Sequence, residues 1–174
     1  MRLFSGLDRT DYQDVLRAIG ALIDRRHVAD FRLLELEDGL LLQTWHFVLQ
    51  PVKVELQRFT DAQLRAVLEA AYQRRGSGGP RRAGRFEETL RAIGRLLDTR
   101  GWRDFRLATQ EEGLILQATP SSARAFETYL LTPDEIAALR REAAAQRGTG
   151  PLTPPAAGPP AAAPGARRPE EPRE

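Results

Sequence analysis

The chain has 174 residues, no cysteine, and 26 basic against 24 acidic side chains, for a net charge of +2. A chain of this length forms one or two small domains, and the lack of cysteine excludes disulfides, thiolate metal sites and cysteine nucleophiles. The balanced charge argues against a protein that tracks a phosphate backbone.

The sequence repeats itself at an offset of 74 residues. The segment LRAIG at residues 16–20 returns at 90–94, and DFRL at 30–33 returns at 104–107. Self-similarity in one register predicts an internal duplication. We therefore expect two αβββα units at residues 1–75 and 86–148. A Gly/Arg-rich linker at 76–85 joins them, and a disordered Pro/Ala-rich tail at 149–174 follows.

The first unit begins with a helix whose apolar residues recur on one face. Thr10 and Gln13 have the spacing of a capping box at its start. Strands are predicted at residues 30–37 and 40–47, joined by a two-residue turn at Asp38 and Gly39. A third strand is predicted at 52–58.

The closing helix of this unit is signalled by Thr60 and Gln63, a second capping box, and ends at Gly76. In the second unit the same elements follow, with a helix from Phe86, a turn at Glu112 and Gly113, and a third strand at 125–131. Its closing helix begins with Thr132 and Glu135 at capping-box spacing.

Two aspartates occupy equivalent positions in the first helix of each unit. Asp24 and Asp98 each follow the helix glycine by four residues. We interpret them as carboxylates at solvated helix ends, where nearby backbone N–H groups satisfy them.

The two faces of each hairpin differ in character. One face carries Phe31, Leu33, Leu40 and Leu42, with apolar counterparts in the second unit, and is predicted to be the core face under the helices. The opposite face of the first unit is also apolar, and its residues are Leu34, Leu36, Leu41 and Trp45. Large exposed apolar patches are uncommon on monomers, so this face requires a cover. The other repeat, a second copy in a homodimer, or a protein partner could supply that cover.

Arginines provide the alternative hypothesis, nucleic-acid binding. The basic cluster at the end of the first unit and in the linker consists of Arg74, Arg75, Arg81, Arg82 and Arg85. Arg32 and Arg106, each beside a glutamine on the second sheet face, would assist it. Flexible arginine-rich segments bind phosphate backbones without reading sequence.

Other functions have less support. The two histidines do not recur between the units, so no metal site is expected, and no nucleophile and base stand at readable spacing. No apolar run approaches the length of a membrane span, and no signal peptide is visible, so a cytoplasmic protein is expected. The sequence thus predicts an α+β fold, two duplicated αβββα units with helices on one face of antiparallel sheets in a pseudo-twofold arrangement. Its predicted function is a non-enzymatic protein-interaction or regulatory module without a cofactor.

Overall fold

The computed structural model describes residues 11–28, 30–46, 52–76 and 83–145, which form four helices and six strands. The N-terminal half consists of α1 (Tyr12–Arg25), β1 (Asp30–Leu36), β2 (Gly39–His46), β3 (Lys53–Thr60) and α2 (Asp61–Gly76). The C-terminal half consists of α3 (Arg85–Arg100), β4 (Arg103–Gln110), β5 (Gly113–Thr119), β6 (Glu127–Leu131) and α4 (Pro133–Ala145). The predicted α+β class is confirmed. The predicted tail and most of the predicted linker lie outside the described residues.

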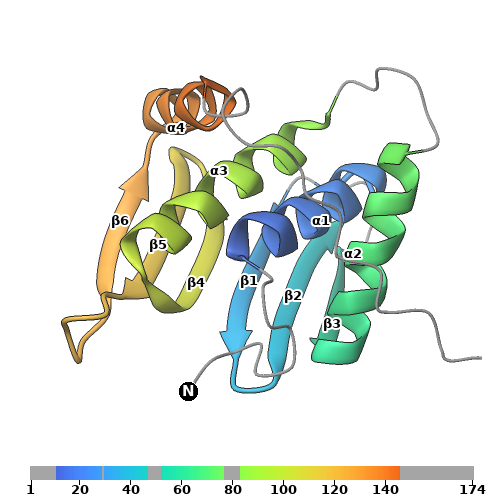
Figure 1. Cartoon of the computed structure of the whole chain (residues 1–174), viewed down its shortest axis with the longest axis horizontal. Coiled ribbons are helices and arrows are strands. Elements are labelled where there is room, and N and C mark those ends of the chain that lie inside the picture. Colours follow the sequence, from blue (N-terminus) through green and yellow to red (C-terminus); the bar gives the residue numbers. More distant parts are fainter. Residues whose placement is uncertain (1–10, 29, 47–51, 77–82, 146–174) are drawn as a thin grey trace, which may run out of the picture.

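All six strands belong to one antiparallel sheet, in the order β3-β2-β1-β4-β5-β6 (Figure 1). The first strands of the two halves, β1 and β4, are neighbours at its centre. They pair over three rungs, with Leu33 opposite Leu107 in the middle. The two halves therefore join edge to edge in a single sheet, an arrangement that the sequence left open.

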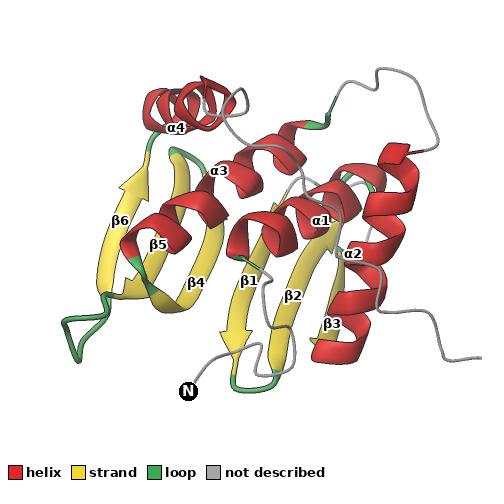
Figure 2. Cartoon of the chain, viewed as in Figure 1, coloured by secondary structure: helices red, strands yellow, loops and turns green. Residues whose placement is uncertain are grey.

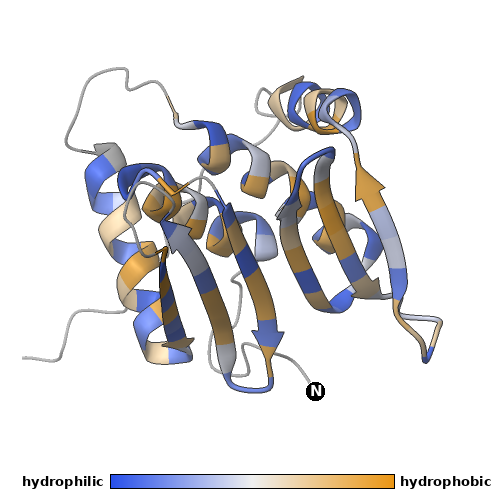
Figure 3. Cartoon of the chain, turned by 180° about the vertical axis from the view of Figure 1, so that it is seen from behind, coloured by the Kyte–Doolittle hydropathy of each residue, from blue (hydrophilic) through white to orange (hydrophobic). Residues whose placement is uncertain are grey.

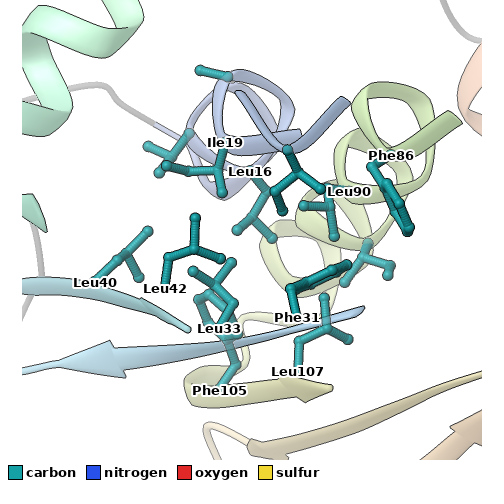
Figure 4. Packing of buried hydrophobic residues seen from close by; sticks show 14 of the residues in the cluster. Leu16, Ile19, Phe31, Leu33, Leu40, Leu42, Phe86, Leu90, Phe105 and Leu107 are labelled. Atoms are coloured by element: carbon teal, nitrogen blue, oxygen red, sulfur yellow. The ribbon is translucent and has the colours of Figure 1, made fainter. Parts of the chain in front are cut away.

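The helices cover one face of this sheet, and α1 and α3 lie side by side across its centre (Figure 2). The residues predicted for the core face lie beneath them, and Phe31, Leu33 and Leu40 are fully buried (Figure 4). Glycines let the two helices approach closely. A Cβ atom at Gly20 would lie 2.4 Å from the carbonyl oxygen of Phe86, and one at Gly94 would lie 2.5 Å from that of Tyr12.

The helices α1 and α3 cap each other: the start of each one is capped by an aspartate of the other. Asp24 accepts the backbone N–H groups of Phe86 and Glu87 at 3.0 and 2.8 Å. Asp98 accepts those of Tyr12 and Gln13, both at 2.9 Å. These carboxylates satisfy N–H groups that the first turn of a helix leaves without a partner.

The interpretation of the two aspartates needs a correction. Asp24 and Asp98 lie near helix ends and accept backbone N–H groups, but these groups belong to the other helix, so both carboxylates are contacts between helices. The capping box predicted for the first helix includes Thr10, which lies outside the described residues; the N-cap is Asp11, which makes no side-chain cap, and the N–H of Gln13 donates to Asp98. The predicted capping boxes of α2 and α4 are confirmed. Thr60 exchanges bonds with Gln63, and Thr132 exchanges bonds with Glu135.

The first hairpin turns one residue earlier than predicted. Its turn residues are Glu37 and Asp38, and Gly39 already pairs with Leu36. Gly39 adopts a φ of +151°, and a Cβ there would collide with the carbonyl oxygen of Phe59 on β3. The glycine thus permits the close approach of β3 rather than forming the turn. Compared with the predicted pairing, each β1 residue lies opposite a β2 residue two positions earlier in the sequence. Because side chains alternate along a strand, this even shift leaves the predicted faces unchanged.

Side chains extend the pairing of β1 and β4 beyond its three rungs. At one end Thr109 Oγ1 accepts the N–H of Phe31 at 3.0 Å and donates to its carbonyl oxygen at 3.2 Å. At the other end the Glu35 carboxyl accepts the N–H of Phe105 at 3.0 Å and the hydroxyl of Tyr12 at 2.6 Å. Burial raises the pKa of Glu35 to about 7, although both hydrogen bonds oppose that rise. Burial and the neighbouring Glu35 also raise the pKa of Tyr12.

Candidate interaction surface

The sheet face opposite the helices, here called the open face, is not covered by any described element (Figure 3). The second half of the chain extends the sheet sideways, so it does not supply the cover that the sequence analysis required. On the β1–β2 hairpin, Leu34 lies opposite Leu41, and Trp45 lies opposite Val54 of β3. Together with Leu36, the predicted residues Leu34, Leu41 and Trp45 share this face and are half-buried by their neighbours.

The apolar surface is wider than the four residues predicted for it. On the edge strand β3, Val54 is 47% exposed and Leu56 is 68% exposed. Towards the other edge, Leu130 of β6 is 44% exposed and lies opposite Ile115. The alternation of Val54 and Leu56 along the predicted third strand could have revealed the first two, because partners in register share a face.

Two arginines lie at the centre of the open face, one on each central strand. Arg32 lies opposite Gln43 and Arg106 opposite Gln117, the two pairs that the sequence analysis placed on this face. The Arg32 guanidinium lies over the Trp45 ring, 5.3 Å from its centroid. The Arg106 guanidinium lies 4.9 Å from the centroid of Phe126, which is itself 48% exposed. Each ring holds its arginine by cation–π attraction.

On the two central rungs of this face the charges are of one sign. The two central rungs that run across all six strands carry Arg58, Arg32 and Arg106 on the open face, and no carboxylate. Arg58 is paired with Asp38 of the hairpin turn at 2.5 Å. Arg32 and Arg106 form no ion pair with a carboxylate of the described residues. Two guanidinium groups therefore remain available at the centre of an apolar surface.

The linker arginines are only partly described. Arg74 is exposed near the end of α2, and Arg85 is exposed at the start of α3, where it lies over the Phe86 ring at 5.3 Å. Arg81, Arg82 and the side chain of Arg75 lie outside the described residues. Arg32 and Arg106 lie on the open face, and Arg85 begins a helix on the other side of the sheet. The described members of the alternative site are therefore not brought together on one surface.

A separate groove of about 390 Å³ lies between α3, α4 and the turn that joins β4 to β5. Arg85, Arg140, Asp30 and Glu111 line it, so its charges balance. The hydroxyl of Thr89 in the groove donates to the carbonyl oxygen of Arg85 at 2.8 Å. Thr89 and Thr109, whose hydroxyl bonds to the backbone of Phe31, thus hold the surrounding elements together.

No cluster of three or more histidine, aspartate or glutamate side chains suited to a metal ion occurs in the part of the chain that the structure describes. None of the helices in that part is long and apolar enough to cross a bilayer.

Comparison with protein-family models, with curated proteins and with solved structures found no match for this chain.

Proposed function

We propose that this protein is a non-enzymatic interaction module that binds another protein through the open face of its sheet. The observation that carries the proposal is the apolar surface formed by β3, β2 and β1, with Leu41 and Trp45 near its centre. Monomers rarely leave a contiguous apolar patch of this kind in water, and such patches mark interaction sites. Tryptophan and arginine are enriched among the residues that contribute most to binding.

The dimensions of the open face suit a protein partner. Six strands about 4.8 Å apart and about seven residues long present a face of roughly 600 Å². A stable protein interface buries about 800 Å² on each partner. The open face alone therefore supplies most of the area that one side of such an interface needs, and it is too broad and flat for a small ligand.

We further propose that the sheet arose by duplication and that a pseudo-twofold axis passes between Leu33 and Leu107. These residues are equivalent in the two sequence repeats and lie opposite each other at the junction. The mutual capping by Asp24 and Asp98 supports the same relation. In this account the two halves have diverged on the open face, and the N-terminal half has kept the apolar surface for binding.

The proposal is tested by affinity capture from cells of the source organism, with three versions of the full chain as bait. The Leu41→Ser/Trp45→Ser variant removes the centre of the patch. Tyr72→Ser is the matched control, because Tyr72 is 48% exposed on α2 and lies away from the open face. We expect a partner that the wild type and the control retain and the double variant loses, with all three folded by circular dichroism.

Two results would contradict this proposal. One is a partner retained equally by the double variant. The other is binding that nuclease treatment abolishes and that requires the arginines from Arg74 to Arg85, which would establish the nucleic-acid alternative instead. Light scattering on the same samples reports self-association, and a dimer lost in the double variant would identify a second copy as the occupant.

A further inference from the structure

Resting on the proposed function, we propose that the occupant of the open face is an acidic segment of another protein. Its carboxylates pair with Arg32 and Arg106, and apolar side chains between them pack on the leucines of the sheet. The inference follows from the sign and placement of charge among the apolar residues of this face, and from the way the two arginines are held.

Arg32 and Arg106 are held differently from Arg17 on α1 and from Arg58, the third arginine of the open face. Arg17 is paired with Glu87 at 3.0 Å, and Arg58 with Asp38 at 2.5 Å. Arg32 and Arg106 instead lie over aromatic rings and have no carboxylate partner among the described residues. Burying them in an apolar interface without a counter-charge would weaken the binding free energy, because an unpaired charge would be removed from water. The partner must therefore bring negative charge to both.

Stacking prepares the two side chains for this role. A guanidinium that lies on a ring keeps its N–H groups at the edge of its plane, where they can donate two parallel bonds to a carboxylate. Since the Trp45 and Phe126 rings fix the positions of the two groups, less side-chain entropy is lost on binding. Preorganised arginines of this kind favour a carboxylate partner over a purely apolar one.

The geometry of the junction also indicates how the charges are spaced. Arg32 and Arg106 are diagonal neighbours across β1 and β4, a relation that separates Cα atoms by about 7–8 Å. Their side chains diverge, because Trp45 belongs to β2 and Phe126 precedes β6. The carboxylates of the segment should therefore lie on either side of a central apolar contact with Leu34 and Ala108.

A second copy of the chain fits this face poorly. Two open faces stacked centre to centre would bring Arg32 and Arg106 of both copies together, with no carboxylate on the central rungs to offset them. Like charges facing one another across an interface oppose association. Charge complementarity thus favours a different protein over self-association.

A single-stranded nucleic acid fits less well than an acidic protein segment. Proteins that bind such strands stack the bases on bare aromatic rings. On this face the Trp45 and Phe126 rings are each already covered by a guanidinium, and the rest of its apolar surface is aliphatic. Leucine and valine side chains suit the apolar residues of a peptide.

The test is a selection from a random peptide display library, with the wild-type chain as the target. The Leu41→Ser/Trp45→Ser variant serves for counter-selection, so that only peptides bound at the open face are kept. We expect the selected peptides to alternate aspartate or glutamate with apolar residues. A synthetic peptide of the selected sequence should lose about tenfold in affinity for Arg32→Glu/Arg106→Glu, the size expected for two partly exposed ion pairs replaced by repulsion.

A charge exchange makes the test specific. The same peptide with its acidic residues replaced by lysine should bind Arg32→Glu/Arg106→Glu better than the wild type. If that variant does not fold, Arg32→Gln/Arg106→Gln replaces it, and the affinity of the acidic peptide should then fall and become less sensitive to salt.

The outcomes separate this inference from the proposed function. Apolar peptides without acidic residues, bound equally by the arginine variants, would overturn the inference and leave the interaction face standing. Failure of the selection to yield any peptide that distinguishes the wild type from Leu41→Ser/Trp45→Ser would overturn both. Binding of a single-stranded RNA probe at the open face, competing with the peptides and lost in the arginine variants, would assign the arginines to phosphate and also overturn the inference.

Discussion

The cap that α1 provides to α3 leads to a prediction that a double-mutant cycle can test. The N-cap residue of α3, Gly84, has the extended backbone of a capping position but no side chain. Asp24 takes over its role by accepting two N–H groups of the first turn. A lost cap costs about 1 kcal/mol, and the lost interaction between the carboxylate and the helix dipole adds about 0.3–1 kcal/mol. Asp24→Ala should therefore destabilise the protein by about 1.3–2 kcal/mol.

The second arm of the cycle is Gly84→Ser. In the wild type a Cβ at this position would lie 2.0 Å from Asp24 Oδ2, so serine and the aspartate carboxylate compete for the same space. Once Asp24 is replaced by alanine, the serine hydroxyl can cap α3 locally, since Gly84 already has the φ and ψ of an N-cap. We expect Asp24→Ala to cost almost nothing in the Gly84→Ser background.

The assay is urea unfolding followed by circular dichroism, with the four proteins of the cycle compared at one pH. Glu142→Ala, which removes an exposed carboxylate from α4, is the control and should change the unfolding free energy by about 0.5 kcal/mol or less. Equal costs of Asp24→Ala in both backgrounds would refute the reasoning. So would a cost no larger than that of the control.

Three further predictions concern the core junction and the open face. Since the pKa of Glu35 rises from 4.5 to about 7 on folding, the folded state binds the extra proton, and the unfolding free energy should fall as pH increases from 4.5 to 7. Glu35→Gln should reduce that slope in urea titrations and leave the part due to Asp98, whose pKa burial raises to about 6. Gly20→Ala and Gly94→Ala should each destabilise the protein by about 1–3 kcal/mol, because backbone carbonyls block the added methyl groups; thermal melts no lower than that of the wild type would contradict the close helix contact. Leu56→Ser should reduce binding of an apolar fluorescent dye to the native protein while shifting its stability by about 0.5 kcal/mol or less; unchanged dye binding would argue against an accessible apolar face.

The local structure was predictable because local signals determine it. Alternating apolar residues placed Phe31 and Leu33 on the core face, and the capping boxes at Thr60 and Thr132 fixed the starts of α2 and α4. The contacts between the halves were not predictable in this way. The bonds of Asp24 to α3 span more than 60 residues of sequence, and no periodicity reports such a partner.

On the open face, too, some residues could be predicted from local signals and others could not. Leu41 and Trp45 were assigned to the second face of the sheet because strand residues alternate, and that assignment depends on pairing parity alone. Phe126 fell within the strand predicted at 125–131, but it was not assigned to the open face, and in the structure it precedes β6. Its contact with Arg106 lies within the C-terminal half, where it joins β4 to the residue before β6 across the intervening strand β5, and alternation along one strand does not report such a partner.

Site-specific photo-crosslinking in cells of the source organism tests the central claim most directly. A photoreactive amino acid replaces Leu56 on the open face in one version of the chain and Tyr72 on α2 in another. The account predicts a discrete adduct with a second protein from position 56, lost when Leu41→Ser/Trp45→Ser is added, and none from position 72. An adduct from position 72 alone, or one from position 56 that survives the double substitution, would contradict it.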